Sequence, residues 1–168
     1  MSTDLDALMG SVDAPLIVVT TAAEGERAGC LVGFHSQASI GPQRYCFWLS
    51  KANHTYRVAL SSDRFAVHFL TSIDEGLARL FGARSGSETD KFTGLATTVT
   101  EAGVPLIADL PNRIIVERIA MLDDGGDHVC TTARVLAAES AGAFTPLRPS
   151  QLADLSPGHT SDERAVHP

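Results

Sequence analysis

The sequence lacks the features that define several large classes of protein. No apolar run approaches the roughly 20 residues needed to span a membrane, and the first ten residues carry acids where a signal peptide has bases. Basic residues are few: 13 Lys and Arg stand against 20 Asp and Glu, a formal net charge of -7. Such a chain gains little from counterion release on a phosphate backbone. We therefore expect a cytoplasmic protein with neither a nucleic-acid nor a membrane partner.

Cysteine and paired histidine are also scarce. Cys30, Cys46 and Cys130 are odd in number, far apart and each within an apolar run, which predicts reduced core thiols. The close CxxC spacing of a metal or redox site is absent. His35 and His54 have no His-x-His or His-Glu neighbour, so we interpret them as polar loop and capping residues and expect no metal site.

Motifs of the common nucleotide and hydrolase sites are missing too. No Gly-rich turn stands at the spacing of a Rossmann or P-loop site. No glycine-flanked serine predicts the nucleophile elbow of a hydrolase. A nicotinamide nucleotide would therefore need an open cleft in place of a dedicated dinucleotide fold.

What the sequence does contain is a series of short strand patterns. Aromatic, β-branched or alternating apolar residues predict strands at residues 16–21, 28–34, 45–50, 65–70, 96–101, 113–122 and 128–138. The run Asp123-Asp124-Gly125-Gly126 predicts a hairpin turn between the last two. Six or seven strands without regular strand–helix alternation predict an antiparallel barrel, closed or partly closed.

Two or three short helices accompany these strands. Residues 3–9 show helical spacing up to Gly10, and Asn53 can cap a helix over residues 55–61. Ser72 and Glu75 form a capping box for a further helix over residues 73–81.

The 168 residues suit one domain. We place the barrel in residues 1–140. The remaining residues 141–168 are polar and hold Pro146, Pro149 and Pro157. They predict a C-terminal tail, an arm that lies on a partner subunit, or a disordered segment.

The most unusual stretch offers two half-sites for a ligand. Ser36, Gln37, Ala38 and Ser39 form an expected loop of small and hydroxyl residues, where the backbone can approach a flat molecule closely.

The second half-site is an expected helix start. Asn53, His54 and Thr55 stand there, where free N–H groups and the helix dipole favour a phosphate. Lys51 and Arg57 add positive charge nearby.

A series of motifs in fixed order carries a family resemblance. The motifs are VVTT ending at Thr21, SIGPQ at 39–43, FWLS at 47–50, NHT at 53–55, LARLFG at 77–82, Lys91-Phe92, and GDH at 126–128. Over residues 8–138 the chain resembles the flavin-reductase-like family of FMN-binding split barrels. It departs from the family pattern at Gly41, Gln43 and Ala133-Arg134.

The resemblance implies a mainly β fold, an antiparallel, Greek-key-like split β-barrel with two or three short helices. It implies a homodimer with FMN, or FAD, at or near the subunit interface. The segment from Ser36 to Ser39 would contact the flavin ring and ribityl chain. Asn53, His54 and Thr55 would hold the phosphate, with Lys51 as an electrostatic helper.

Two further residues acquire roles from the resemblance alone. His128 aligns with a family histidine near the flavin or nicotinamide, where it would position the substrate or supply a proton. Phe92, of the Lys91-Phe92 pair, would belong to the cofactor site.

The function implied is that of an NAD(P)H-dependent flavin reductase, in which hydride passes to the flavin. The reduced flavin would supply a partner monooxygenase or another acceptor. The alternatives are a non-catalytic module that binds flavin, deazaflavin or haem, and a plain dimeric scaffold.

Overall fold

The computed structural model describes residues 3–83 and 90–153 of the chain. Within these residues the strands are β1 (Ile17–Ala23), β2 (Glu26–Val32), β3 (His35–Ser39), β4 (Arg44–Ser50), β5 (Arg64–Phe69), β6 (Thr97–Val99), β7 (Pro105–Ile107), β8 (Arg113–Leu122) and β9 (His128–Glu139). The helices are α1 (Thr3–Val12), α2 (His54–Ala59), α3 (Glu75–Ala83) and the 3-10 turn η1 (Pro149–Leu152).

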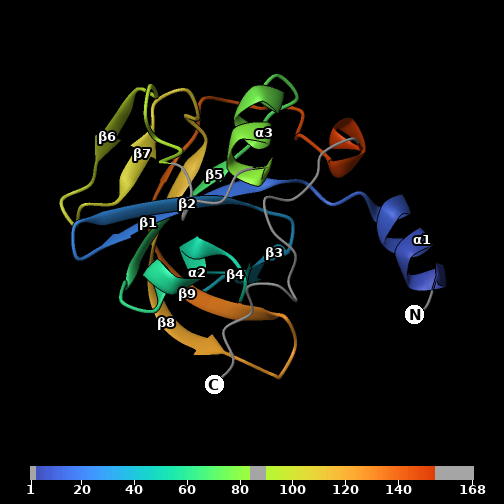
Figure 1. Ribbon diagram of the computed structural model, residues 1–168, viewed down its shortest axis with the longest axis horizontal. Helices are drawn as coiled ribbons and strands as arrows, with labels where there is room; N and C mark the ends of the chain where they lie inside the picture. Colours follow the sequence, from blue (N-terminus) through green and yellow to red (C-terminus); the bar gives the residue numbers. More distant parts are fainter. Residues whose placement is uncertain (1–2, 84–89, 154–168) are drawn as a thin grey trace.

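Seven strands form one curled antiparallel sheet in the order β2-β1-β5-β8-β9-β4-β3, and β6 pairs with β7 in a small second sheet (Figure 1). Strand alternation sorts the core into two layers. Ile17 and Val19 face the inside of the curl, where they pack with Ala59 of α2. The arrangement confirms the predicted mainly β split barrel with a few short helices.

The second layer lies between the sheet and α3. Val18 and Leu70 pack there with Phe81 and with Leu147, which is fully buried. The Leu147 backbone bonds to Leu16 and Leu70, with N···O distances of 2.9 and 3.0 Å. Residues on both sides of the expected boundary at residue 140 are therefore packed together, with Leu147 in the core. The rest of the expected tail, residues 154–168, lies outside the described residues.

Two predicted elements differ from the structure. Residues 36–39 form most of strand β3 rather than a loop, because Ser36 pairs with Cys46 along β4. Small polar residues are compatible with a strand there, since β3 is the last strand of the sheet.

Helix α3 begins at Glu75 instead of residue 73. The predicted capping box is wrong, because the reaching carboxylate is that of Asp74, which accepts the Thr71 N–H at 2.7 Å, and Glu75 does not accept the Ser72 N–H. Ser72 instead donates its N–H to the Thr145 carbonyl at 2.9 Å.

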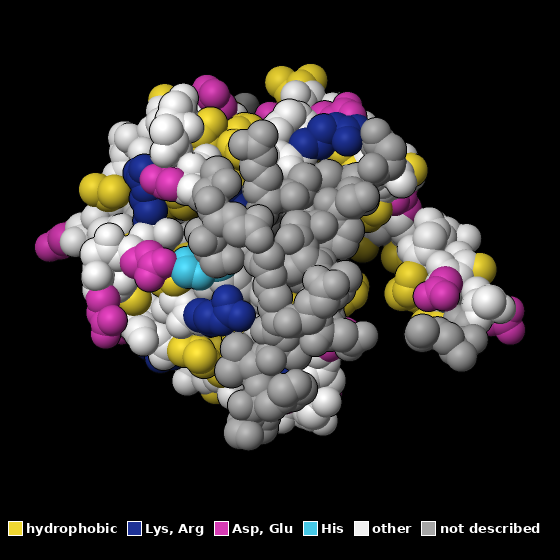
Figure 2. All heavy atoms as spheres, viewed as in Figure 1, with side chains coloured by type: hydrophobic (Ala, Val, Ile, Leu, Met, Phe, Trp, Pro, Cys, Tyr) yellow, Lys and Arg dark blue, Asp and Glu magenta, His cyan; other side chains and the backbone are white. Residues whose placement is uncertain are grey.

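Helix α1 projects from the body as an arm (Figures 1 and 2). None of its residues is buried. Its apolar side chains, spaced as one face of a helix, are Leu5, Leu8, Met9 and Val12, each between 54 and 62% exposed. None of the helices in the described part of the chain is long and apolar enough to cross a membrane.

Asp13 fixes the base of this arm. Its backbone has φ of 50°, in the left-handed region that Asp tolerates better than most residues. Its carboxylate accepts the Ser150 N–H at 2.9 Å and the Ser150 hydroxyl at 2.6 Å. Its carbonyl accepts Arg148 Nη1 at 2.8 Å. The turn at the end of α1 is thus tied to the C-terminal part of the body.

Candidate functional site

Strand β3 supplies an exposed backbone edge. Ser36, Gln37 and Ala38 are all exposed, and the strand has one hydrogen-bonded neighbour, β4. An edge strand offers N–H and C=O groups on its open side. Such groups can meet the carbonyl oxygens and ring nitrogens of a flat heterocycle. One of them, the Gln37 carbonyl, accepts the Ser36 hydroxyl at 2.9 Å.

The pleat of β3 points its side chains to two opposite sides. Ser36 is the partner of Cys46 and shares its outer face, where the Cys46 thiol donates to the Ser36 carbonyl at 3.3 Å. Gln37 is the partner of Tyr45 and shares the inner face. The Ser36 side chain therefore lies on the outer face, and the Gln37 side chain lies on the inner face.

Pairing between β4 and β9 brings a second segment to that outer face. Ser50 is the partner of His128, and the Lys51 N–H donates to the Asp127 carbonyl at 2.9 Å. The rings of Phe34 and His128 lie 4.9 Å apart between centroids. Phe34 directly precedes β3, so its ring joins the β3 end of the face to His128.

A carboxylate orients the His128 ring. Nδ1 of His128 lies 2.7 Å from Asp127 Oδ1, and a carboxylate can only accept, so Nδ1 carries a proton. The hydrogen bond from His128 holds the pKa of Asp127 below its ordinary value. The remaining ring nitrogen, Nε2, is the one that can face a ligand.

Lys51 and His54 lie near the start of α2, each beside a carboxylate. Lys51 Nζ is 2.9 Å from Asp123 Oδ1, and His54 Nε2 is 2.6 Å from Glu26 Oε1. The Lys51 and His54 side chains are 12 and 15% exposed, whereas their carboxylate partners are 42 and 59% exposed. Lys51 also lowers the pKa of Asp123 through its hydrogen bond. An anionic ligand would thus compete with solvent-exposed carboxylates for Lys51 and His54.

Asn53 and Thr55 are committed to the fold. Asn53 caps α2 as predicted, and its Oδ1 accepts the Thr55 N–H at 2.8 Å. Thr55 is 1% exposed, and its hydroxyl hydrogen-bonds to the Cys30 thiol. Both side chains were predicted to contact a phosphate. In the structure Asn53 is hydrogen-bonded as the cap of α2, and Thr55 is buried in the core.

Phe92 lies away from this face, in the second core layer. It is 3% exposed and packs edge-on to Phe81 with centroids 5.5 Å apart. A Cβ at Gly29 would lie 2.9 Å from Phe81 and 3.1 Å from Phe92, so glycine on β2 makes room for the pair. The structure brings Phe92 together with packing residues and not with the other predicted site residues.

Lys91 beside it is equally structural. Its ammonium donates to the Gly29 carbonyl at 3.2 Å and the Phe81 carbonyl at 2.8 Å. Burial lowers the pKa of Lys91. The Lys91-Phe92 motif thus joins α3 to β2.

Sequence reasoning missed Phe34 and gave no separate role to Asp127. The available signals were an aromatic residue directly before the polar segment and the acid within the GDH motif. No group of three or more His, Cys, Asp or Glu residues could hold a metal ion among the residues that the structure describes.

Comparison with known proteins identifies the domain type of the chain. The model of the flavin reductase like domain matches residues 9–148. The ferric-chelate reductase (NAD(P)H) of Archaeoglobus fulgidus is 28% identical over 126 residues, 74% of each chain. Other curated relatives are longer, and the chain spans 24% of one and 50% of another.

Two solved structures share the fold. A flavin reductase, HpaC, complexed with NADP+, has a TM-score of 0.72 at 22% identity, covering 85% of this chain and 91% of the other. An FMN-binding protein from Thermus thermophilus has a TM-score of 0.70 at 23% identity, covering 76% and 72%. These matches confirm the resemblance inferred from the ordered motifs.

Proposed function

Since the chain belongs to the family of flavin reductase-like domains, we propose that it binds FMN on the outer face of β3 and reduces flavin with NAD(P)H. The family match confirms the prediction of a flavin-dependent oxidoreductase. The observation that carries the binding site is the meeting of three segments there: the edge of β3, Lys51 at the end of β4, and His128 at the start of β9.

The ring system would lie against the β3 edge. The donors and acceptors of residues 36–39 suit the carbonyl and imide groups of a flavin, and Ser36 adds a hydroxyl on the same face. Phe34 offers an exposed aromatic surface, 59% of its area, at the end of that strand. Bound flavin supplies the redox chemistry, as acceptor of a hydride from the nicotinamide.

The phosphate end would be held by the charge of Lys51 and by the Nε2–H of His54. Both side chains are largely shielded, and their present carboxylate partners are exposed. Asn53 and Thr55 would act indirectly, because one caps α2 and the other anchors it in the core. The proposal thus moves the expected phosphate contacts from the whole helix start to the side chains of Lys51 and His54.

His128 is the proposed residue at the nicotinamide side. The Asp127 carboxylate holds Nδ1, which leaves Nε2 as the ring nitrogen for a ligand. In that position His128 orients the nucleotide amide or holds a proton at Nε2. Replacement by Asn should raise the KM for the nucleotide by a larger factor than it raises the Kd for FMN.

The test is titration of the purified protein with FMN, followed by flavin fluorescence and by NADH and NADPH oxidation. Binding of FMN with nucleotide oxidation supports the reductase. Binding without oxidation supports the alternative of a non-catalytic flavin module, and absence of FMN binding overturns the site. Parallel titrations with riboflavin and FAD decide which flavin the site prefers.

The electron acceptor can be tested in the same assay. The similarity to a ferric-chelate reductase favours ferric chelates as a second candidate acceptor beside a partner monooxygenase. Reduction of Fe(III)–EDTA in excess of the rate explained by free reduced FMN would identify direct transfer to iron. Equal rates would leave release of reduced flavin as the function.

We also propose a homodimer, with α1 as an arm on the second copy. The apolar face of α1 is exposed in the single chain, and exposed apolar helix faces of this kind are typical of partner contacts. Leu8→Glu with Met9→Glu should convert dimer to monomer in sedimentation. Ile73→Glu, at a side chain that is 89% exposed, is the control and should leave the dimer intact.

The three thiols support a cytoplasmic setting. Cys30, Cys46 and Cys130 are free and buried, the state in which a reducing compartment keeps cysteine.

A further inference from the structure

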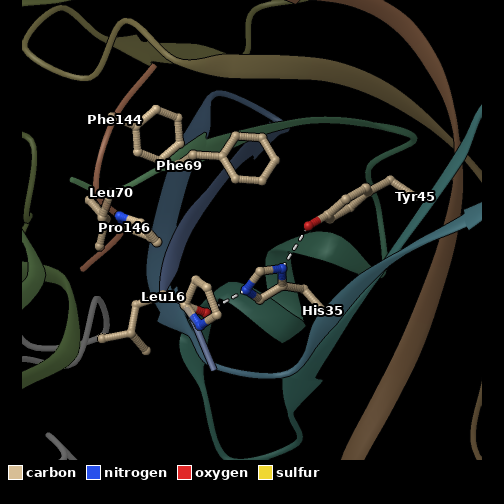
Figure 3. A pocket seen from close by; sticks show the side chains of 8 residues that line it. Leu16, His35, Tyr45, Phe69, Leu70, Phe144 and Pro146 are labelled. Atoms are coloured by element: carbon tan, nitrogen blue, oxygen red, sulfur yellow. Dashed lines mark hydrogen bonds between the residues drawn. The ribbon is translucent and has the colours of Figure 1, made fainter. Parts of the chain in front are cut away.

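A cavity of about 340 Å³ opens on the other side of β3, at the end of the barrel (Figure 3). Leu16, Phe69 and Phe144 supply most of its apolar wall, and His35 and Tyr45 supply its polar groups. The described residues that line it include no Lys, Arg, Asp or Glu. Apolar cavities of about 150 Å³ already admit benzene, so this one has room for a one- or two-ring molecule.

The polar groups form a chain whose proton positions follow from chemistry. His35 Nε2 lies 2.6 Å from the Pro15 carbonyl oxygen. A carbonyl can only accept, so Nε2 carries a proton. Burial lowers the pKa of His35, which keeps the ring neutral and leaves Nδ1 as an acceptor.

Tyr45 must then donate. Its hydroxyl oxygen lies 2.7 Å from His35 Nδ1, and its only proton is directed there. Burial also raises the pKa of Tyr45 to about 12, so the phenol stays protonated. Its oxygen keeps lone pairs but has no second proton, so it can accept a hydrogen bond and cannot donate one to a ligand.

The packing around this pair fits an aromatic ring. The ring of Phe69 stands edge-on to Tyr45 at 88°, with centroids 5.8 Å apart. Phe144 is 41% exposed and lies at the mouth. Arg44 and Arg113 line neighbouring hollows beyond Phe69 and not this cavity. A charged ligand would lose its hydration here without gaining a counter-charge.

We propose that this cavity binds a neutral aromatic alcohol of the phenol class, with its ring among Leu16, Phe69 and Phe144 and its hydroxyl donating to Tyr45. The site is separate from the proposed flavin face, because His35 and Ser36 point to opposite sides of β3. The inference therefore goes beyond the proposed function and does not depend on it.

The experiment compares phenol with anisole, which has the same ring but no hydroxyl proton. Ligand-observed NMR titrations on the full chain, with and without FMN, should give phenol about 5-fold tighter binding than anisole, the fold-change equivalent to one neutral hydrogen bond. Tyr45→Phe should weaken phenol to the level of anisole and leave anisole unchanged. That pattern is specific to the hydroxyl acceptor.

Two further variants separate packing from folding effects. Phe144→Ala removes a partly exposed wall and should weaken phenol and anisole alike, by about 5-fold. Val99→Ala, at another exposed apolar side chain that does not line the cavity, should change neither.

Three results would overturn the proposal. The first is equal affinity of phenol and anisole for the unaltered chain, or no binding of either. The second is displacement of phenol by FMN, which would assign phenol to the flavin face. The third is phenol binding only after Leu8→Glu and Met9→Glu, which would make the α1 arm of a second copy the natural occupant.

Discussion

The two sides of strand β3 differ in charge and polarity, although the strand is only five residues long. On the outer side Ser36 meets a surface with ion pairs, where Lys51 and His128 each contact a carboxylate. On the inner side His35 meets a neutral, apolar cavity. The alternation of one edge strand thus lets adjacent residues serve ligands of opposite character, a charged cofactor and an uncharged ring.

The largest expected effect is on stability at low pH, and it comes from a buried histidine. This residue, His68, shows how far full burial lowers an imidazole pKa, for comparison with the half-buried His35 on the inner side of β3. His68 is fully buried between the Val18 carbonyl and the Ile107 N–H. Burial lowers its pKa to about 4 from 6.5. The unfolded chain takes up a proton below pH 6.5 and the native chain does not, so stability falls as pH drops from 6.5 to 4, by about 3 kcal/mol.

Urea unfolding at a series of pH values measures this loss. The variant His68→Gln should be less stable at pH 7 but show a flatter dependence between pH 6.5 and 4. An unchanged slope in this variant would assign the acid sensitivity to other groups.

The second prediction breaks the outer side alone. Ser36→Leu places a bulky apolar group on the proposed flavin face and should weaken FMN binding about 100-fold, or about 2.7 kcal/mol. Gln37→Leu makes the same change one residue along, where the side chain lies toward Tyr45. It should leave FMN affinity within about 3-fold. Flavin fluorescence measures the FMN affinity of both variants. Equal losses of affinity would refute the assignment of the two side chains to opposite faces.

The third prediction isolates charge on the outer side. Lys51→Met should weaken FMN about 20-fold, because a charge-assisted contact to phosphate is lost. Riboflavin, which has no phosphate, should bind with unchanged affinity. Arg79→Met removes a cation from a surface ion pair on α3 and is the control. A similar loss for riboflavin and FMN would move the phosphate away from Lys51.

The smallest effect compares the two sides without any ligand. Tyr45→Phe leaves His35 Nδ1 without its donor and should lower the free energy of unfolding by about 1.5 kcal/mol. Ser36→Ala, at an exposed position, should change it by less than about 0.5 kcal/mol. Urea denaturation of both variants gives the difference, and a reversed order would contradict the contrast between the sides.

The sequence predicted the strands from periodicity where one face of a strand is buried, as in Phe65, Val67 and their neighbours on β5. It could not predict β3, because an exposed edge strand of small polar residues has the composition of a loop. Pro105–Ile107 was missed as well, since three residues are too few to show an alternation.

For the site, roles that depend on neighbouring residues could be predicted from the sequence, and roles that depend on contacts between distant segments could not. Asn53 was recognisable as a cap because capping depends on residues two positions apart. Burial of Thr55 against Cys30 and of Phe92 against Phe81 depends on contacts between distant segments. Motif order therefore located the cofactor region but did not separate ligand contacts from packing residues.

Asp13 has a consequence for how far the chain can reach. The ten residues of α1 form a helix about 15 Å long at 1.5 Å per residue. Asp13, at its base, is hydrogen-bonded to Ser150 and Arg148. The direction of α1 therefore depends on residues near the opposite end of the sequence. A change at Ser150 would therefore alter the orientation of α1 relative to the sheet and leave the helix itself intact.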